Sequence, residues 1–137
     1  MIRYIQGDMF LHFPQNLPVG KKGLLPHVVN DRGAWGAGFV LPLGRRFPRA
    51  KASYQVWSKG TSNYLTPFEQ GRDLLVSMDE GVVVAHMCAQ GLGGERPINY
   101  GSLVKCMYGV IKHCPPKTHE IHAPMFGSDL AGGCWDF

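Results

Sequence analysis

The pattern of apolar and polar positions predicts strands that alternate with helices along the chain. Short apolar runs bounded by glycine or polar residues indicate buried strands, whereas apolar residues spaced three or four apart indicate helices. Alternating elements of this kind are typical of an α/β fold, in which helices cover a partly parallel sheet. The predicted strands are 2–8, 23–30, 73–78, 82–87 and 119–124, and the predicted helices are 38–47, 48–60 and 101–114.

Length and composition narrow the class of protein. A chain of 137 residues with 45% hydrophobic residues suits one folded domain and argues against disorder. No apolar run approaches the roughly 18 residues that span a bilayer, and the first ten residues lack a basic region followed by an apolar core. We therefore expect a cytoplasmic protein without a membrane partner, whose four cysteines are free thiols.

The cysteines and histidines do not predict a metal site. No C-x-x-C pair occurs, although five cysteine and histidine side chains toward the C-terminus are of types that can bind a metal. These are Cys106, His113, Cys114, His119 and His122. The favoured alternative places small cysteines in the core and the histidines on strand or loop surfaces. The sequence thus predicts neither a metal nor a cofactor.

The formal net charge of +4 is concentrated in one segment, which carries Arg45, Arg46, Arg49 and Lys51. A basic run can face nucleic acid, but this run is short and lies in a predicted helical region. A solvated helix face is therefore the favoured interpretation, and nucleic acid is not an expected partner. A modest positive field would also attract a small anionic ligand.

The segment VVNDRGAWGAGF at 28–39 places three glycines within six residues, directly after an apolar run. It lacks both the Gly-Lys-Ser/Thr of a P-loop and the G-x-G-x-x-G spacing of a dinucleotide fold. A second glycine-rich segment, 127–133, follows the last predicted strand. Ligands of open α/β sheets bind outside the carboxyl ends of the strands, so these two loops could hold the two sides of a diphosphate.

Five segments, taken together and in order, carry a resemblance to a known family. They are QGD at 6–8, HVVNDRGAWGAGFVLPLGRRFPRAKASYQVW at 27–57, VVVAHMCAQ at 82–90, INYGSL at 98–103 and APMFGSDLAGGCW at 123–135. In this combination the chain resembles the macro domain family, above all its small single-domain members that process ADP-ribose 1″-phosphate. The resemblance implies a three-layer α/β/α sandwich with a mixed central sheet over residues 1–137, and an ADP-ribose cleft at the sheet edge. Family members continue beyond the last tryptophan, so we expect a C-terminal helix and strand to be missing after Phe137.

The same resemblance assigns expected ligand contacts. Asp8 would accept a hydrogen bond from the adenine amino group and the Met9 N–H would contact the ring, although Asp8 can also be read as a simple turn residue. Asn30 would hold the distal ribose, and Gln90 could reach that sugar unless it is only a polar strand terminus. Trp35 would shape the pocket or anchor its loop in the core. The expected loop contacts are Gly33, Trp35, Gly36, Ala37, Gly38 and Phe39 on one side, and Gly127, Ser128, Asp129, Leu130, Ala131 and Gly132 on the other.

Hydrolysis at the ribose 1″ position is the chemistry that the resemblance implies, with Asn30, His27 and Asp31 as candidate catalytic residues. His27 has a suitable intrinsic pKa, but it can also be read as a buried, inert histidine. Strand alternation places it on the opposite face from Asn30 unless the strand bends. Asp31 is a candidate general base. The lysine–aspartate mechanism of one family branch is not available, because Gln90 and Ala131 occupy the corresponding positions.

These observations predict a hydrolase that binds ADP-ribose and converts ADP-ribose 1″-phosphate to ADP-ribose and phosphate. Two alternatives stay open: a reader of ADP-ribose without turnover, and an enzyme that removes ADP-ribose from modified protein. The expected partners are ADP-ribose or its 1″-substituted forms, with ADP-ribosylated protein added under the second alternative.

Overall fold

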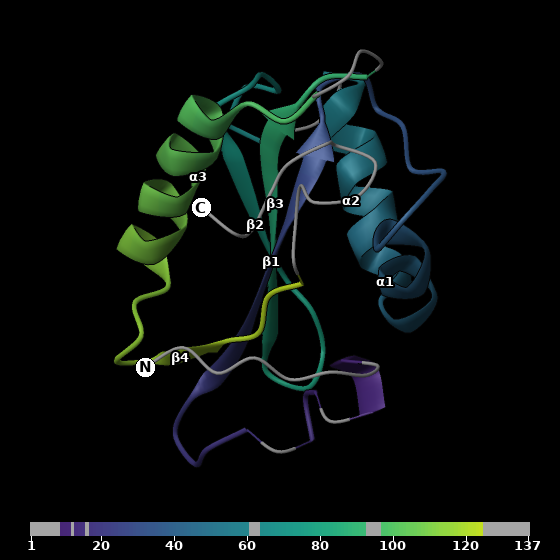
Figure 1. Cartoon of the computed structure of the whole chain (residues 1–137). Coiled ribbons are helices and arrows are strands. Elements are labelled where there is room, and N and C mark those ends of the chain that lie inside the picture. Colours follow the sequence, from purple (N-terminus) through teal and green to yellow (C-terminus); the bar gives the residue numbers. More distant parts are fainter. Residues whose placement is uncertain (1–8, 12, 16, 61–63, 93–96, 125–137) are drawn as a thin grey trace.

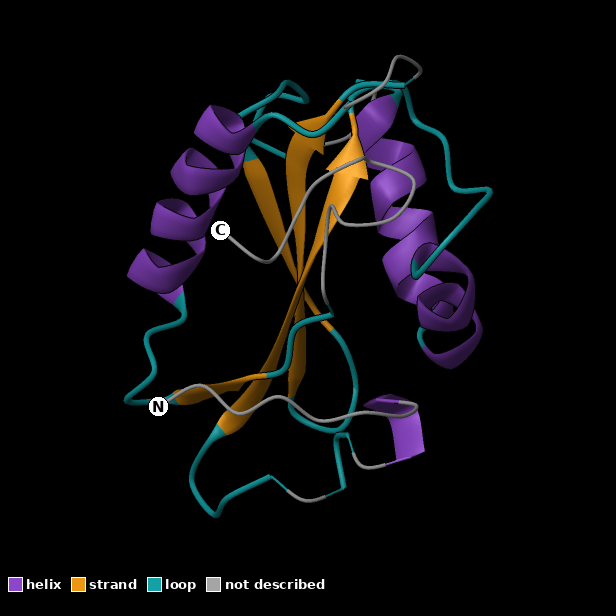
Figure 2. Ribbon diagram, viewed as in Figure 1, coloured by secondary structure: helices purple, strands orange, loops and turns teal. Residues whose placement is uncertain are grey.

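In the computed structural model, the described residues are 9–11, 13–15, 17–60, 64–92 and 97–124. They form a four-stranded sheet with helices on both of its faces (Figures 1 and 2). The strands are β1 (Lys22–Asn30), β2 (Asp73–Ser77), β3 (Val82–Gln90) and β4 (His119–Ile121), and the helices are α1 (Val40–Arg46), α2 (Pro48–Ser58) and α3 (Tyr100–His113). A short 3-10 turn, η1 (Met9–Leu11), precedes β1.

The sheet is mixed, with the strand order β2-β3-β1-β4. β1 runs parallel to β3 and β4, whereas β2 runs antiparallel to β3. The parallel pair β1 and β3 forms the centre, and β3 is buried at every position from Val82 to Ala89. A strand that is covered on both faces has a nearly continuous apolar sequence, which is why these two strands stand out in the sequence.

Two hydrophobic clusters attach the helices to the sheet. One joins α1 and α2 to the face of β1 that carries Leu25 and Val29. The other joins α3 to the opposite face and includes Leu24. Leu24 and Leu25 belong to different clusters because successive side chains of a strand point to opposite faces. Accordingly, α3 lies on one side of the sheet, and α1 and α2 lie on the other (Figure 1).

Proline, glycine and asparagine set the ends of the helices. Pro42 is tolerated as the third residue of α1, because a first-turn N–H has no partner within the helix. Pro48 opens α2, and Gly60 follows its end with a φ of 68°. At the start of α3, the Asn99 side chain accepts a hydrogen bond of 2.9 Å from the Ser102 N–H.

The predicted α/β fold with a mixed sheet is confirmed. The first helix begins at Val40 rather than at residue 38, and the strand predicted at 82–87 extends to Gln90. The strand predicted at 2–8 lies outside the described residues. No helix in the described ranges is long and apolar enough to cross a bilayer.

The basic segment of α1 and α2 contacts the turn between β2 and β3. Arg46 donates from Nη2 to both carboxylate oxygens of Glu80, at 2.7 Å each. Arg49 donates to the Ser77 carbonyl at 2.6 Å and lies 3.7 Å from the Asp79 carboxylate. Two of the four basic residues are thus engaged within the molecule, which favours the solvated helix face over a nucleic-acid surface.

Candidate functional site

The carboxyl ends of the two central parallel strands meet at one edge of the sheet. β1 ends at Asn30 and β3 ends at Gln90. The register of the pair is irregular between Val29 and Asn30: Val29 pairs with Cys88, whereas Asn30 pairs with Gln90. The Asp31 N–H then donates a hydrogen bond of 3.0 Å to the Gln90 carbonyl. This edge is where open α/β sheets place their ligands.

The Asn30 side chain organises the glycine loop that follows it. Its Oδ1 accepts hydrogen bonds from the backbone N–H groups of Arg32 and Ala34, each at 3.0 Å. Its Nδ2 donates to the Ala34 carbonyl at 2.8 Å. Asparagine commonly stabilises turns by bonding to its own backbone a few residues further on. Among the described residues, these bonds use one of the two amide hydrogens of Asn30.

Tyr54, on α2, contacts Asn30 through its hydroxyl group. Its hydroxyl lies 2.7 Å from the Asn30 carbonyl oxygen and 3.0 Å from Oδ1, and its side chain is completely buried. Burial raises the pKa of Tyr54 above its usual value of 10, so the hydroxyl keeps its proton and remains a donor. Because Asn30 Oδ1 contacts Tyr54 of α2, the Asn30 side chain lies on the α2 face of the sheet. Leu25 and Val29 pack on this same face, and the register shift after Val29 explains why the neighbouring residue Asn30 shares it.

The three glycines of the loop have different roles. Gly33 and Gly38 both have a φ of 80°, a conformation that costs little only for glycine. A Cβ on Gly33 would also lie 3.0 Å from the Ser58 hydroxyl oxygen. Gly36 has no positive φ, and a Cβ there would meet no described atom within 4 Å. Turn geometry therefore accounts for two of the glycines and leaves the third unexplained.

Trp35 packs beneath the loop. Only 8% of its surface is exposed, and its ring lies 5.4 Å from the Tyr54 ring and 5.7 Å from the His27 ring, measured between centroids. A Cβ on Gly44 of α1 would approach the indole Nε1 to 2.9 Å, so α1 needs a glycine at this point. This position favours the interpretation of Trp35 as a core anchor of the loop.

His27 belongs to a buried chain of polar groups. Ser53 donates its hydroxyl hydrogen to the Ala50 carbonyl at 2.9 Å, so its oxygen accepts from His86 Nε2 at 3.0 Å. His86 Nδ1 is then the acceptor for His27 Nε2–H at 2.7 Å. His27 and His86 are 1% and 0% exposed.

Both imidazoles of this chain are neutral at neutral pH. Burial, reinforced by the neighbouring His86, lowers the pKa of His27 well below its usual value of 6.5. Burial likewise lowers the pKa of His86 to about 3. The arrangement favours the interpretation of His27 as a structural group, since a proton carrier needs a pKa near the working pH.

Asp31, the first residue after β1, places a carboxylate at the sheet edge. Its Oδ2 accepts a hydrogen bond of 3.1 Å from Gln70 Nε2. Its Oδ1 is buried and has no hydrogen-bond partner among the described residues, and the Arg32 guanidinium Nε is 3.6 Å away. A buried acceptor without a partner is uncommon in native proteins and calls for a physical reason.

The remaining predicted contacts divide into described and undescribed positions. Met9 lies in η1 and Phe39 precedes α1; both are half-buried against the α1–α2 cluster. Ala37 is exposed, and Gln90 is half-buried at the end of β3. Asp8 and the second glycine loop lie outside the described residues, namely Asp8, Gly127, Ser128, Asp129, Leu130, Ala131 and Gly132. Within the described ranges, no three histidine, cysteine or acidic side chains gather as metal ligands would.

Three residues that make side-chain contacts at or near the site received no functional role from the sequence. Tyr54 was predicted only as an apolar position of its helix, His86 only as part of a strand, and Gln70 only as part of a loop. The polar His86 inside an otherwise apolar strand was the one available signal. The other two contacts depend on how distant segments are brought together, which local patterns do not encode.

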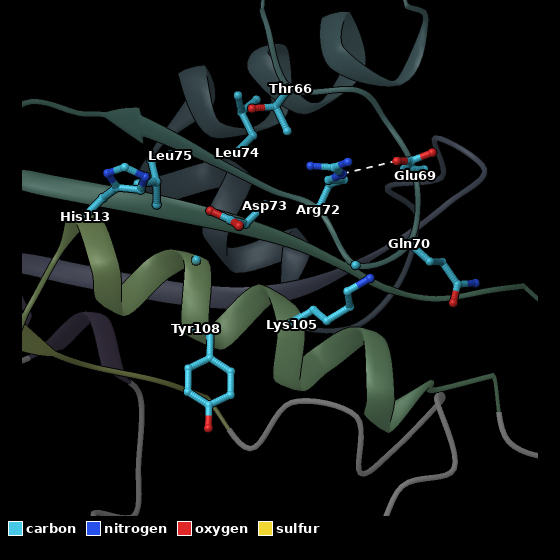
Figure 3. A pocket seen from close by; sticks show the side chains of 12 residues that line it. Thr66, Glu69, Gln70, Arg72, Asp73, Leu74, Leu75, Lys105, Tyr108 and His113 are labelled. Carbon is cyan, nitrogen blue, oxygen red and sulfur yellow. Dashed lines mark hydrogen bonds and ion pairs between the residues drawn. The ribbon is translucent and has the colours of Figure 1, made fainter.

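A separate hollow of about 890 Å³ lies between the outer strand β2 and α3 (Figure 3). Arg72, Asp73, Lys105 and His113 are among the residues that line it. Gln70 lies at the end of the hollow that is remote from His113 (Figure 3). The hollow therefore borders the sheet edge through Gln70, while the glycine loop is not part of its lining.

Comparisons with known proteins agree with this architecture. No protein-family model matches the chain. The structure of a macrodomain protein from Streptomyces coelicolor superposes with a TM-score of 0.71 and 30% identity, over 88% of this chain and 78% of that one. A protein of unknown function from Bacteroides thetaiotaomicron superposes with a TM-score of 0.80 and 29% identity, over 97% of this chain and 82% of that one. The chain belongs to the macro domain family.

A curated relative carries the name of an enzyme. The ADP-ribose 1″-phosphate phosphatase of Candida albicans is 34% identical over 80 residues, which are 58% of this chain and 46% of that protein. The chain thus spans less than half the length of this relative. The DarTG protein of Thermosipho africanus, whose structure is a complex with ADP-ribose, shares the fold with a TM-score of 0.67 at 16% identity, over 94% of this chain and 34% of that one.

Proposed function

We propose that the protein binds ADP-ribose at the carboxyl edge of β1 and β3 and hydrolyses ADP-ribose 1″-phosphate to ADP-ribose and phosphate. The observation that carries the proposal is the loop organised by Asn30. In it, one asparagine side chain and one buried tyrosine shape a glycine-rich turn at the edge where such sheets bind ligands. The name of the Candida albicans relative supports the choice of substrate.

Binding divides between the backbone and a few side chains. Exposed Gly36, Ala37 and Gly38 offer the backbone of the loop to a ribose and a phosphate, since a chain without bulky side chains allows close approach. The remaining amide hydrogen of Asn30 would donate to the distal ribose. Gln90 would reach the same sugar, and Asp8 and Met9 would contact the adenine. Residues Gly127 to Gly132 would hold the diphosphate from the other side.

Hydrolysis needs a group that takes a proton from the attacking water. His27 is buried, neutral and bonded to His86, so Asp31 is the better candidate. Its carboxylate would repel a phosphate that lay directly against it. The proposal therefore places a water between Asp31 and the 1″ phosphate.

A reader of ADP-ribose without turnover is the second candidate function. The specific observation that favours it is the neutral state of His27, which removes one of the two predicted proton carriers. Removal of ADP-ribose from modified protein would use the same edge and is tested by the same experiment.

The experiment measures binding and turnover on the same preparations. Calorimetry with ADP-ribose reports binding, and phosphate release from ADP-ribose 1″-phosphate reports turnover; ADP-ribosylated protein is the third substrate tested. We expect the wild type to bind and to release phosphate. Asn30→Ala should lower kcat/KM by about a hundredfold, because it removes both a ligand donor and the centre of the loop.

Gln55→Ala is the matched control, because Gln55 is an exposed residue on α2 whose side chain makes none of the bonds described above. It should retain the wild-type binding and turnover. If the wild type binds ADP-ribose but releases nothing from either substrate, the protein is a reader of ADP-ribose and not a hydrolase. A wild type that does not bind ADP-ribose would overturn the proposal altogether.

A further inference from the structure

We propose that Gln70 is a positioning residue for Asp31. In this proposal, Gln70 holds one carboxylate oxygen of Asp31 so that the other accepts a proton from the water that attacks the 1″ phosphate. The inference rests on the proposed function and adds to it a residue from a distant loop.

A directed chain of hydrogen bonds leads from α3 to Asp31. Gln70 Nε2 donates to Asp31 Oδ2 at 3.1 Å, and the Gln70 amide oxygen is then free to accept. Ser102, in the first turn of α3, donates to that oxygen at 3.4 Å. The ionised Asp31 carboxylate can only accept, so the Gln70 nitrogen faces the carboxylate and the Gln70 oxygen faces the serine hydroxyl.

Backbone bonds hold the three members of this chain in place. The Asp31 N–H donates to the Gln90 carbonyl at 3.0 Å, so the aspartate is tied to β3. The Gly71 N–H, next to Gln70, donates to the Cys88 carbonyl at 2.8 Å. The Asn99 N–H donates to the Ala89 carbonyl at 2.8 Å and fixes the start of α3. All three groups are thus fastened to the last residues of one strand.

The second oxygen of Asp31 is the feature that requires an explanation. Oδ1 is buried and accepts no hydrogen bond from the described residues. A buried, unpaired acceptor costs free energy unless a donor arrives. The Arg32 Nε at 3.6 Å is too distant for a hydrogen bond, and its side chain is 71% exposed, so water screens the pair. An incoming water is a donor of the required kind.

A neutral amide suits this task better than a charged partner. A lysine or arginine at position 70 would favour the ionised carboxylate and lower its pKa, which weakens a base. Glutamine orients the carboxylate with one hydrogen bond and adds no net charge. The amide therefore fixes the geometry of the Asp31 carboxylate, which is what a general base requires.

The proton and bond changes of the step balance. The water oxygen forms a bond to the phosphorus of the 1″ phosphate while one of its protons passes to Asp31 Oδ1. The bond between phosphorus and the 1″ oxygen breaks, and that oxygen takes a proton from solvent. Asp31 then returns its proton to solvent, so the products are ADP-ribose and inorganic phosphate.

Two substitutions of Gln70 test the proposal through the pH dependence of phosphate release. Gln70→Glu places a second carboxylate beside Asp31, so like-charge repulsion should move the acid limb of the kcat profile up by about one pH unit. Gln70→Ala should lower kcat by about tenfold, because Asp31 is no longer oriented, while the Kd for ADP-ribose stays within about twofold. Asp31→Asn should lower kcat by about a hundredfold.

Two further variants separate positioning from a general loss of structure. Ser102→Ala removes only the outer bond of the chain and should lower kcat in the same direction by a smaller factor. Gln55→Ala should leave the pH profile unchanged. An unshifted acid limb in Gln70→Glu, with active wild type, would overturn the inference and leave the proposed function standing. If the wild type shows no turnover, both the positioning role of Gln70 and the proposed hydrolase function are wrong. If the wild type also fails to bind ADP-ribose, the proposed binding site is wrong as well.

Discussion

Acidification should destabilise this protein through its two buried histidines. Burial lowers the pKa of His27 well below 6.5 and that of His86 to about 3. In the unfolded chain both imidazoles bind protons near pH 6.5. The native pKa values are depressed, so the stabilisation is fully present above pH 6.5 and is lost as the pH falls toward the native values.

The magnitude follows from the linkage relation. One pH unit of differential protonation corresponds to about 1.4 kcal/mol, so His86, whose native pKa is about 3, costs roughly 2–3 kcal/mol between pH 7.5 and pH 4.5. The lowered pKa of His27 adds a loss in the same direction, so the two histidines together remove a large fraction of the free energy of unfolding of a typical domain. We therefore expect pronounced acid destabilisation before either imidazole is protonated in the native state.

Urea unfolding curves from pH 7.5 to pH 4.5 measure this slope directly. Below pH 6.5 the free energy of unfolding should approach a fall of about 2.7 kcal/mol per pH unit, the value for an uptake of two protons. His86→Gln removes one of the two titrating groups and should halve the slope, even if it lowers stability at every pH. Gln55→Ala, which removes no titrating group, should keep the full slope. A flat profile, or an unchanged slope in His86→Gln, would refute the reasoning.

Three further predictions concern the glycine loop. Tyr54→Phe keeps the buried ring but leaves the Asn30 carbonyl without its donor at 2.7 Å, so urea unfolding should show a loss of about 1–3 kcal/mol, and calorimetry a weaker affinity for ADP-ribose. An unchanged affinity would mean that Tyr54 does not support the ligand-binding shape of the loop. Gly38→Ala should cost about 1–2 kcal/mol in the same unfolding assay, because its φ is 80°. Gly36→Ala should leave stability unchanged but weaken ADP-ribose binding; a stable variant with wild-type affinity would show that the ligand does not approach Gly36.

The elements of the fold were predictable because their signals are local. β1 and β3 are buried on both faces and read as apolar runs, and α3 repeats apolar residues at helical spacing. Pro48 and Gly60 marked the two ends of α2. The position of Asn30 at the end of a buried strand was equally visible, since a glycine loop follows it directly.

The contacts at the site were not predictable, because they join residues far apart in sequence. His27 and His86 are 59 residues apart and meet only because β1 and β3 pair in parallel with these two positions opposite each other. Local sequence does not fix the register of two strands joined by a crossover. The bend that the sequence analysis required near Asn30 takes the form of a register shift between Val29 and Asn30, which likewise depends on the partner strand.

The structure also changes how a loss of activity at Asn30 should be interpreted. The Asn30 side chain accepts two backbone hydrogen bonds and donates one to the Ala34 carbonyl, so its replacement perturbs the loop as well as the proposed ribose contact. Low activity in Asn30→Ala would therefore not identify a catalytic role. Gln70 offers a cleaner test, because it contacts Asp31 from outside the loop and its substitutions leave the bonds of Asn30 in place. A shifted pH profile in Gln70→Glu would connect the chemistry to Asp31 without disturbing the framework that binds the sugar.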